Sequence, residues 1–461
     1  MAPAKSNGPS LEAISTDVLS LYQRLLPSEY FEQLRRRGTL CENNRVYNAA
    51  VVMWLMIQQR LRGGNMASSV LDLVCGLPPT FWPRPCQRLL SSADGQRRRL
   101  SVNTGAYNEA RQDLDLRITD ESFDRATNGL TAAVMGELPD QGGRIFFVDG
   151  TSMRGAHSAE MCRAYPPGSN QHGEAHWPVL RVLVAHDLHT GLALRPQWGP
   201  MYGTHAVSEQ GLFEAMLERL PRGSTVLADI NFGVFSVAYA ADQRGNATLL
   251  RLQATRAKRM LGGKPLQDGI DQRVQWRPSR EERKQHPQLP VDACVVGRII
   301  VRQVQPGNGG QPFLLALFTT HEEPAEALVD LYGKRWNIEV DLRTLKSTLQ
   351  LEQLTCTSPE MVAKEIVMGM LAYNLVRAVT FVAAQAAGVA PRAFSFTQVR
   401  NVINAFAPRI AAAKSVEEAQ RLYEDLLYYA SQARLPKRSR PRGAYPRAVW
   451  GHGERFPSRR K

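Results

Sequence analysis

No two cysteines of this sequence stand at the spacing of a metal or redox pair. The 461 residues include six cysteines and no Cys-x-x-Cys, so neither a zinc site nor a disulfide framework is predicted. The first ten residues also lack the apolar core of a secretory signal. These absences argue against a small disulfide-stapled secreted domain and fit a reducing cytoplasm.

Long uninterrupted apolar runs are missing too. A membrane-spanning helix needs about 20 apolar residues. Residues 49–57 fall far short of that length, and residues 366–390 are interrupted by Asn374, Arg377 and Gln385. Both segments are therefore predicted to be buried helices, and no membrane association is expected.

Two common enzyme motifs are absent. Without Gly-x4-Gly-Lys-Ser/Thr no ATP requirement is expected, and without Gly-x-Ser-x-Gly the set His205, Ser208 and Glu209 does not predict a serine hydrolase. Ser208 is instead predicted to cap a helix. His172 and His176 do not form His-Glu-x-x-His, so a surface or DNA-facing loop is favoured over a zinc site there.

Positive charge is in excess and is unevenly spread. The net charge is +14, and residues 434–461 hold ten Lys or Arg and one acid. A basic body with a strongly basic tail predicts a polyanionic partner, most often nucleic acid. A tail that only increases solubility is the alternative.

The residue pattern changes from helical to strand-like near Gly142. Residues 1–140 carry helical periodicity and the basic cluster 96–99, which predicts a helical N-terminal DNA-binding domain. Strand patterns then predict an α/β fold with a mixed sheet. The strands are expected at residues 144–148, 179–187, 192–198 and 226–229, and helices at 208–220 and 232–244.

The predicted fold is thus a catalytic core in two parts, with helical regions at both ends. The first part covers residues 141–248, and short strands at 249–315 predict a β-rich insertion. The second part covers 316–390. Residues 391–461 are predicted to form a helical C-terminal region and the basic tail.

Four polar residues form a stripe within a predicted helix at residues 324–349. Tyr332, Arg335 and Lys346 lie −7, −4 and +7 residues from Glu339, which places all four within roughly 60° on an α-helix. A separate apolar face would anchor the helix; it consists of Leu331, Ile338, Leu342, Leu345 and Leu349. A solvated face, with Glu339 paired to arginines one turn away, is the alternative.

Two further acids follow apolar strand patterns. Asp149 comes after residues 144–148, and Asp229 after Val226-Leu-Ala. Carboxylates on neighbouring strands repel each other unless divalent cations lie between them, and Mg²⁺ favours such oxygen ligands. With Glu339 the pair predicts a two-metal phosphodiester site. Taken singly, each aspartate is more typical of a turn at the end of a strand or of a helix cap.

The Tyr332-x2-Arg335-x3-Glu339-x6-Lys346 signature resembles the YREK motif of DDE transposases from bacterial insertion sequences, in the group typified by insertion sequence four. Residues 148–151 and 227–232 resemble the first and second acid motifs of that family. The acids lie 80 and then 110 residues apart, again as in the family, and the resemblance spans about residues 100–385.

This resemblance implies a ribonuclease H-like core with Asp149, Asp229 and Glu339 as ligands of two Mg²⁺ ions, for which Mn²⁺ is a substitute. It implies binding of double-stranded element ends, their hydrolysis, and joining of the freed 3′-hydroxyl to target DNA. Arg335 and Lys346 would hold phosphates near the cleaved end, and Tyr332 would contact the same region.

The resemblance also implies partners and a setting. Synapsis requires at least two protomers, so a homodimer is expected in the bacterial cytoplasm, associated with the nucleoid when bound to DNA. Relatives flip a base during cleavage, and Trp276 is one candidate for stacking on it. Two alternatives are a non-catalytic DNA-binding descendant and a metal-dependent nuclease of similar fold; inverted repeats flanking the gene would exclude the nuclease.

Overall fold

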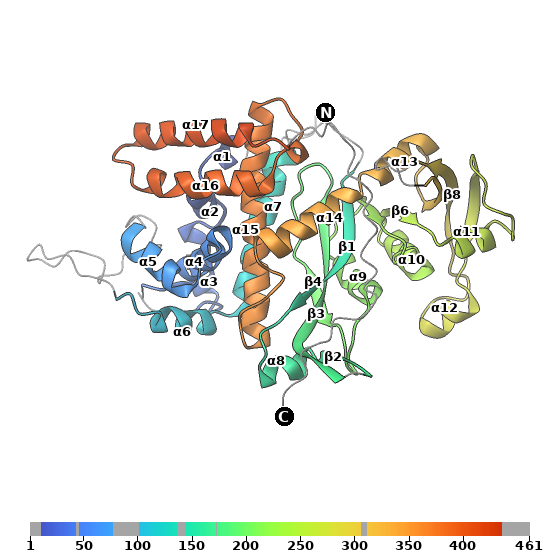
Figure 1. Cartoon of the computed structure of the whole chain (residues 1–461), viewed down its shortest axis with the longest axis horizontal. Helices are drawn as coiled ribbons and strands as arrows, with labels where there is room; N and C mark the ends of the chain where they lie inside the picture. The colour runs from blue at the N-terminus through green and yellow to red at the C-terminus, as the bar shows by residue number, and fades with distance from the viewer. Residues whose placement is uncertain are drawn as a thin grey trace, which may run out of the picture. The chain divides into compact units, whose positions relative to one another are not determined.

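The computed structural model describes residues 11–42, 46–76, 101–135, 143–171, 173–305 and 311–435 (Figure 1). These residues fall into two units. A helical unit draws on residues 1–139, 189–195 and 343–435, and a sheet unit on residues 140–188 and 196–342. The basic cluster 96–99, His172 and most of the basic tail lie outside the described residues.

The helical unit combines helices from both ends of the chain. Its N-terminal helices are α1 (Leu11–Ile14), α2 (Val18–Leu25), α3 (Ser28–Arg36), α4 (Ala49–Arg62), α5 (Met66–Gly76), α6 (Gly105–Asp113) and α7 (Leu116–Met135). Its C-terminal elements are η2 (Thr344–Thr348), α15 (Pro359–Ala386), η3 (Pro391–Ala393), α16 (Phe396–Ala411) and α17 (Val416–Gln432). Side-chain oxygens of Asp17, Asn48, Ser358 and Ser415 cap the first turns of α2, α4, α15 and α17.

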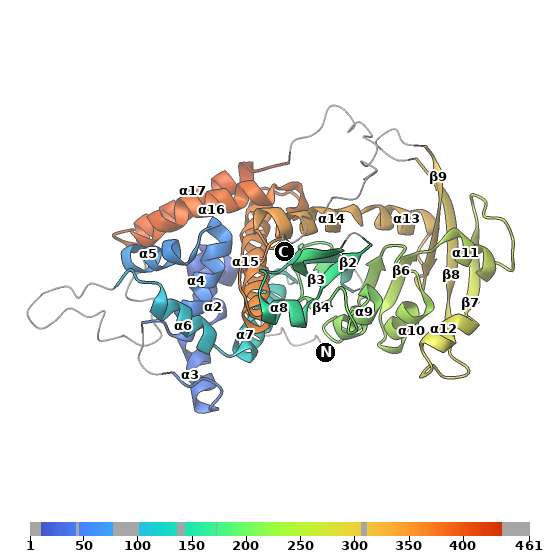
Figure 2. The same cartoon turned by 60° about the horizontal axis from the view of Figure 1, so that its bottom comes forward.

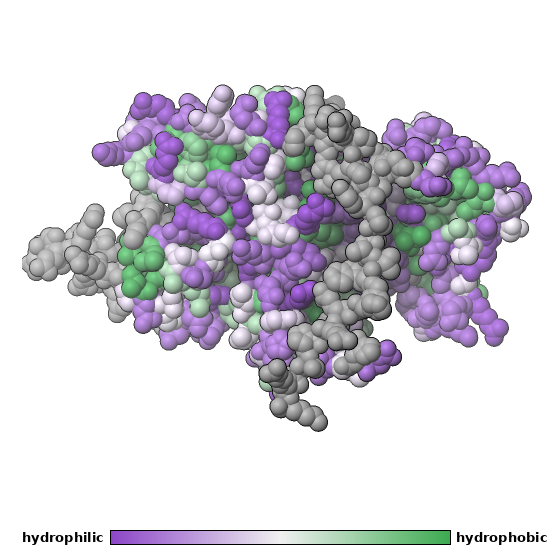
Figure 3. Space-filling model, viewed as in Figure 1, coloured by the Kyte–Doolittle hydropathy of each residue, from purple (hydrophilic) through white to green (hydrophobic). Residues whose placement is uncertain are grey.

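Helix α15 is the centre of the helical unit. It packs against α2, α4, α7, α16 and α17, and its residues are buried from Met361 to Ala384. Among the described helices it is the one long and apolar enough to cross a membrane, and that apolar stretch is entirely buried. The prediction of a buried helix is confirmed. In contrast to the buried α15, the surface of α17 is mostly hydrophilic (Figure 3).

Asn374 of α15 explains one wrong prediction. Its side chain accepts a hydrogen bond from Ala193 N and donates one to Ala193 O, both 2.8 Å long. These bonds use the backbone groups that a strand at residues 192–198 would need for pairing. Only residues Gln197–Pro200 form a strand.

A buried lysine joins α6 to α15. Lys364 is fully buried, and its ammonium group donates to the carbonyls of Arg111 and Gln112 at 3.1 and 3.0 Å. It also pairs with Glu360 at 2.8 Å. The two carbonyls belong to the C-terminal end of α6, where carbonyls lack helical partners and a cation is favourable.

We predict that Lys364→Met destabilises the protein. The methionine fills the space but leaves the buried carbonyl of Arg111 and the part-buried carbonyl of Gln112 without this donor, which costs roughly 2 kcal/mol. Urea unfolding measures the change, with the exposed Lys414→Met as the control in the same unit. A loss no larger than that of the control would show that Lys364 does not hold α6 in place.

The described strands of the sheet unit form one mixed sheet of nine strands in the order β2-β3-β1-β5-β6-β9-β8-β7, with β4 paired to β3. The strands are β1 (Ile145–Arg154), β2 (Pro167–Asn170), β3 (Gly173–Asp187), β4 (Gln197–Pro200), β5 (Thr225–Ala228), β6 (Ala247–Arg251), β7 (Asp271–Trp276), β8 (Val295–Val304) and β9 (Phe313–Thr319). The predicted α/β class with a mixed sheet is confirmed.

Helices cover both faces of this sheet. They are α8 (Ala159–Ala164), α9 (Glu209–Leu217), α10 (Phe235–Gln243), α11 (Ala254–Met260), α12 (Arg280–Gln285), α13 (Ala325–Gly333) and α14 (Trp336–Arg343). Figure 2 shows α13 and α14 above β2, β3 and β6, and α9 and α10 below them. The predicted cap is confirmed, because Ser208 Oγ accepts from Gly211 N at 3.0 Å at the start of α9.

Residues 247–319 extend the core sheet. Strand β6 lies parallel to β5, and β9 then pairs with β6 in the antiparallel sense. The predicted division at residue 249 therefore falls inside β6 (Ala247–Arg251). The division of the chain into five domains stays a prediction.

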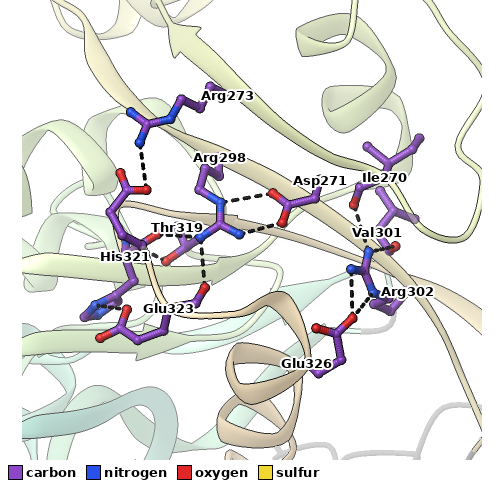
Figure 4. A network of polar contacts seen from close by, with 11 residues as sticks. Ile270, Asp271, Arg273, Arg298, Val301, Arg302, Thr319, His321, Glu323 and Glu326 are labelled. Carbon is purple, nitrogen blue, oxygen red and sulfur yellow. Dashed lines mark hydrogen bonds and ion pairs between the residues drawn. The ribbon is translucent and has the colours of Figure 1, made fainter.

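An arginine network ties the extension to the start of α13 (Figure 4). The guanidinium of Arg298 binds both oxygens of Asp271, at 3.0 and 2.6 Å, and donates to the carbonyls of His321 and Glu323. Arg302 pairs with Glu326 of α13 at 3.0 Å. Bidentate pairs of this kind fix geometry as well as charge, so β8 holds the helix that carries Tyr332.

Candidate active site

The register of two parallel strands places Asp149 next to Asp229. Strand β1 pairs with β5, and the last pair in the ladder is Val148 with Ala228. The next residue on each strand is the aspartate. The prediction that the two aspartates lie close together is confirmed, because their carboxylates interact electrostatically. Buried apolar residues before each aspartate hold the ladder in this register.

The prediction that Asp149 ends its strand is wrong. Strand β1 runs on to Arg154, and Asp149 pairs with Val184 of β3. The parallel neighbour β5 ends at Ala228, but the antiparallel neighbour β3 continues to pair with β1 beyond that point. Residues 149–152 therefore remain part of the strand. Each aspartate also accepts a hydrogen bond from a backbone amide: Gly150 N at 2.8 Å and Asn231 N at 2.9 Å.

Burial and a like charge perturb the first aspartate. The pKa of Asp149 is raised to about 7, first by burial and then by the charge of Asp229. The Gly150 amide and the Arg335 guanidinium act in the opposite direction but do not cancel these effects. A pair of carboxylates with this imbalance favours a bound cation.

The predicted helix at residues 324–349 is wrong in detail. Helix α13 ends at Gly333, α14 begins at Trp336, and the π-helical turn Thr344–Thr348 follows α14. At the first junction Lys334 N and Arg335 N donate to carbonyls three residues back, the tighter spacing of a 3₁₀ turn. Glycine disfavours a helix interior, and Gly333 marks the break.

Arg335 links two of the three predicted acids. Its Nη1 lies 3.8 Å from Asp149 Oδ2, and its Nη2 lies 3.2 Å from Glu339 Oε1. The pairing of Glu339 with Arg335, one of the two predicted alternatives, is therefore present. The guanidinium is 13% exposed, whereas the Glu339 side chain is 35% exposed.

Tyr332 is buried on α13, with 7% exposure. Burial raises the pKa of its hydroxyl to about 12, and the nearby Arg335 counteracts this only in part. The hydroxyl makes no hydrogen bond of ordinary geometry, although Arg335 lies close enough to act on it electrostatically. Tyr332 therefore lies beside Arg335, behind the exposed surface.

Four of the five residues predicted to anchor the segment 324–349 are buried. Ile338, Leu345 and Leu349 are fully buried and Leu342 is 9% exposed, whereas Leu331 of α13 is only partly buried. No sequence pattern points to Asp341, which is fully buried with its Oδ2 3.9 Å from His186 Nδ1 of β3. This contact holds α14 to the sheet two residues after Glu339. Lys346 lies in the π turn that follows.

The roles predicted for Trp276 and His176 do not agree with the structure. Trp276 is 1% exposed and packs edge-on against Phe235 and Phe318, so the prediction that it stacks on DNA is wrong. Trp336 is 62% exposed beside Arg335. His176 lies in β3 rather than a loop, and its ring stacks on His157 at 4.5 Å.

The chemistry of the donors fits a hard divalent cation, but the acids are not assembled into a complete ligand set. Asp149 and Asp229 offer the carboxylate oxygens that Mg²⁺ prefers. Within the described ranges, no three Asp, Glu, His or Cys side chains lie close enough together to hold one metal ion. Glu339 instead contacts Arg335.

We predict a pH effect on stability from Asp149. Its folded-state pKa of about 7 lies above the ordinary 3.8, so the folded protein holds this proton more tightly than the unfolded chain does. The free energy of unfolding therefore falls as pH rises between these values. Without divalent ions, Asp149→Asn should gain stability relative to the unsubstituted protein from about pH 5 to about pH 8.

Thermal unfolding in a chelator measures this effect, with the exposed Asp330→Asn as the control. Added Mg²⁺ should favour the unsubstituted protein at the higher pH, because it binds the ionised carboxylates. Parallel pH dependences of Asp149→Asn and the unsubstituted protein would contradict the prediction.

Comparisons with known proteins agree with the acid pattern. The family model described as "Transposase DDE domain" matches residues 140–375. The chain is also 25% identical over 317 residues to "Transposase InsG for insertion sequence element IS4" of Escherichia coli (strain K12), covering 68% of this chain and 69% of that protein. A solved piggyBac transposase synaptic complex with hairpin DNA matches at 12% identity, 93% and 84% coverage and a TM-score of 0.41, too distant to bear on the fold.

The family match extends over slightly more than half of the 461 residues and includes both aspartates and the signature helix. Transposases act on DNA, and DDE enzymes generally use divalent metal ions. The chain therefore belongs to the DDE transposase family, of the insertion sequence four type.

Proposed function

We propose that Asp149, Asp229 and Glu339 are the catalytic acids of this transposase. The observation that carries the proposal is the β1–β5 register, which brings Asp149 and Asp229 together at the end of a parallel ladder. Arg335 then links Asp149 to Glu339. Rotation of this guanidinium toward a DNA phosphate would free both acids for cations.

We further propose a ribonuclease H-like core. The support is the order β4-β3-β1-β5-β6, in which three antiparallel strands are followed by two strands parallel to β1. Residues 249–315 would be an insertion that extends this core sheet. Residues 1–140 would recognise element ends, and residues 391–461 would form the helical C-terminal region with a basic tail.

Two Mg²⁺ ions, or Mn²⁺ in their place, would activate water and stabilise the leaving oxygen during cleavage and strand transfer. Asp149 and Asp229 would hold these ions from the sheet, and Glu339 from α14. Arg335 and Lys346 would hold phosphates of the cleaved end. Tyr332 would support this DNA contact by packing against Arg335, since burial keeps its ring from the surface.

The protein would act on the two ends of its insertion sequence and on target DNA. Two ends must be held together before strand transfer, so we propose a homodimer in the synaptic complex. The proposed setting is the bacterial cytoplasm, at the nucleoid. A DNA-binding descendant without catalysis is disfavoured, because partly buried carboxylates near phosphates are costly unless they hold cations.

We predict that Asp149→Asn, Asp229→Asn and Glu339→Gln each abolish cleavage of the element's own ends. Each change keeps the side-chain size and removes one negatively charged metal ligand. Gel assays with purified protein, Mg²⁺ and end DNA measure cleavage, with Asp330→Asn as the control. Cleavage retained by all three variants would refute the catalytic assignment.

We also predict that Arg335→Gln and Lys346→Gln weaken DNA binding and make the remaining affinity less dependent on salt concentration. A lost phosphate contact lowers the slope of log affinity against log salt by about one. Fluorescence anisotropy across a salt series measures this slope, with the exposed Lys414→Gln as the control. Slopes equal to that of the control would place both cations outside the DNA interface.

A further inference from the structure

Glu209 is an acid close to the proposed site that has no role in the function proposed above. It is the first residue of α9, and its side chain is 21% exposed. Its carboxylate lies 3.5 Å from Arg181 Nη1 of β3. It also interacts electrostatically with both Asp149 and Asp229. The other acid of α9, Glu214, is exposed.

Gly150 provides the space that this carboxylate fills. A Cβ atom added to Gly150 would lie 2.2 Å from Glu209 Oε1 and 2.3 Å from its carboxyl carbon. The Glu209 carboxylate is therefore packed directly on the backbone that follows Asp149. The amide of the same glycine donates to Asp149 Oδ1, so a shift of this backbone would move the aspartate.

The start of α9 also holds the backbone that follows Asp229. The Asn231 side chain lies near the Glu209 carboxylate, and Gln210 Nε2 donates to Asn231 O at 2.7 Å. The amide of Asn231 in turn donates to Asp229 Oδ1 at 2.9 Å. Two consecutive residues of α9 therefore contact both of the segments that orient the aspartates.

We propose that Glu209 is a positioning residue that sets the spacing of Asp149 and Asp229 by holding Gly150 and Asn231. This inference rests on the catalytic role proposed for the two aspartates. Metal sites and catalytic sites lose function when supporting contacts let their ligands shift by about 1 Å. Glu209 acts through its neighbours, so its loss affects ligand geometry.

The test compares Glu209→Ala and Glu209→Gln in the full-length protein. Glutamine keeps the size and a side-chain oxygen beside Gly150 and Asn231, whereas alanine removes both. We expect Glu209→Ala to lower Mn²⁺ affinity and kcat for end cleavage by about 10–100-fold, with KM for DNA unchanged. Glu209→Gln should stay close to the unsubstituted protein. Calorimetry with Mn²⁺ measures affinity independently of activity.

Gly150→Ala tests the contact from the other side. Its methyl group collides with the Glu209 carboxylate, so it should reproduce the loss of Mn²⁺ affinity seen with Glu209→Ala. In the double variant the space is vacated, and the methyl group should cause no further loss. Losses that multiply would show that Gly150 and Glu209 act independently and would overturn the proposal.

Two controls separate the possible failures. Glu214→Ala, on the same helix, should change neither Mn²⁺ affinity nor kcat. If Asp149→Asn lowers Mn²⁺ affinity but Glu209→Ala does not, the positioning role is wrong and the catalytic assignment stands. If Asp149→Asn also has no effect, the catalytic assignment itself fails. A lower melting temperature of Glu209→Ala with unchanged affinity and kcat would reduce Glu209 to a structural residue.

Discussion

The parallel pairing of β1 with β5 is the constraint on which the site depends. Apolar residues bury both strands and fix the pair Val148 with Ala228, so the two following aspartates are neighbours whether or not their charges favour it. Burial first, and then the charge of Asp229, raise the pKa of Asp149 to about 7, so part of this shift is the cost of the proximity. Packing energy of the sheet therefore keeps two like charges together, and a cation can then bind them.

Local pattern was sufficient to predict the mixed sheet, the buried helix α15 and the pairing of the two aspartates. It failed where contacts distant in sequence decide the outcome. Residues 192–198 look like a strand, but Asn374 takes the backbone groups of Ala193. The stripe around Glu339 follows from regular α-helical geometry, which the chain leaves on both sides of α14.

The site residues divide in the same way. Spacing alone singles out Tyr332, Arg335 and Glu339 as the signature that we assign to the proposed site, because a fixed motif requires no knowledge of packing. Spacing does not identify Asp341 or Glu209, because an acid in a helix is usually predicted to lie on the surface. Only the fold shows that Asp341 lies against His186 and that Glu209 fills the space left by Gly150.

The π-helical turn Thr344–Thr348 has a consequence for the signature itself. Such a turn accommodates one residue more than an α-helical turn, so the interval between Glu339 and Lys346 contains a residue that regular helix would not need. Deletion of one residue there would let the turn close as α-helix without turning the following segment, because the π turn already absorbs that residue. The seven-residue interval is therefore matched to the widened turn, and a regular α-helix of the same length would point Lys346 in another direction relative to Glu339.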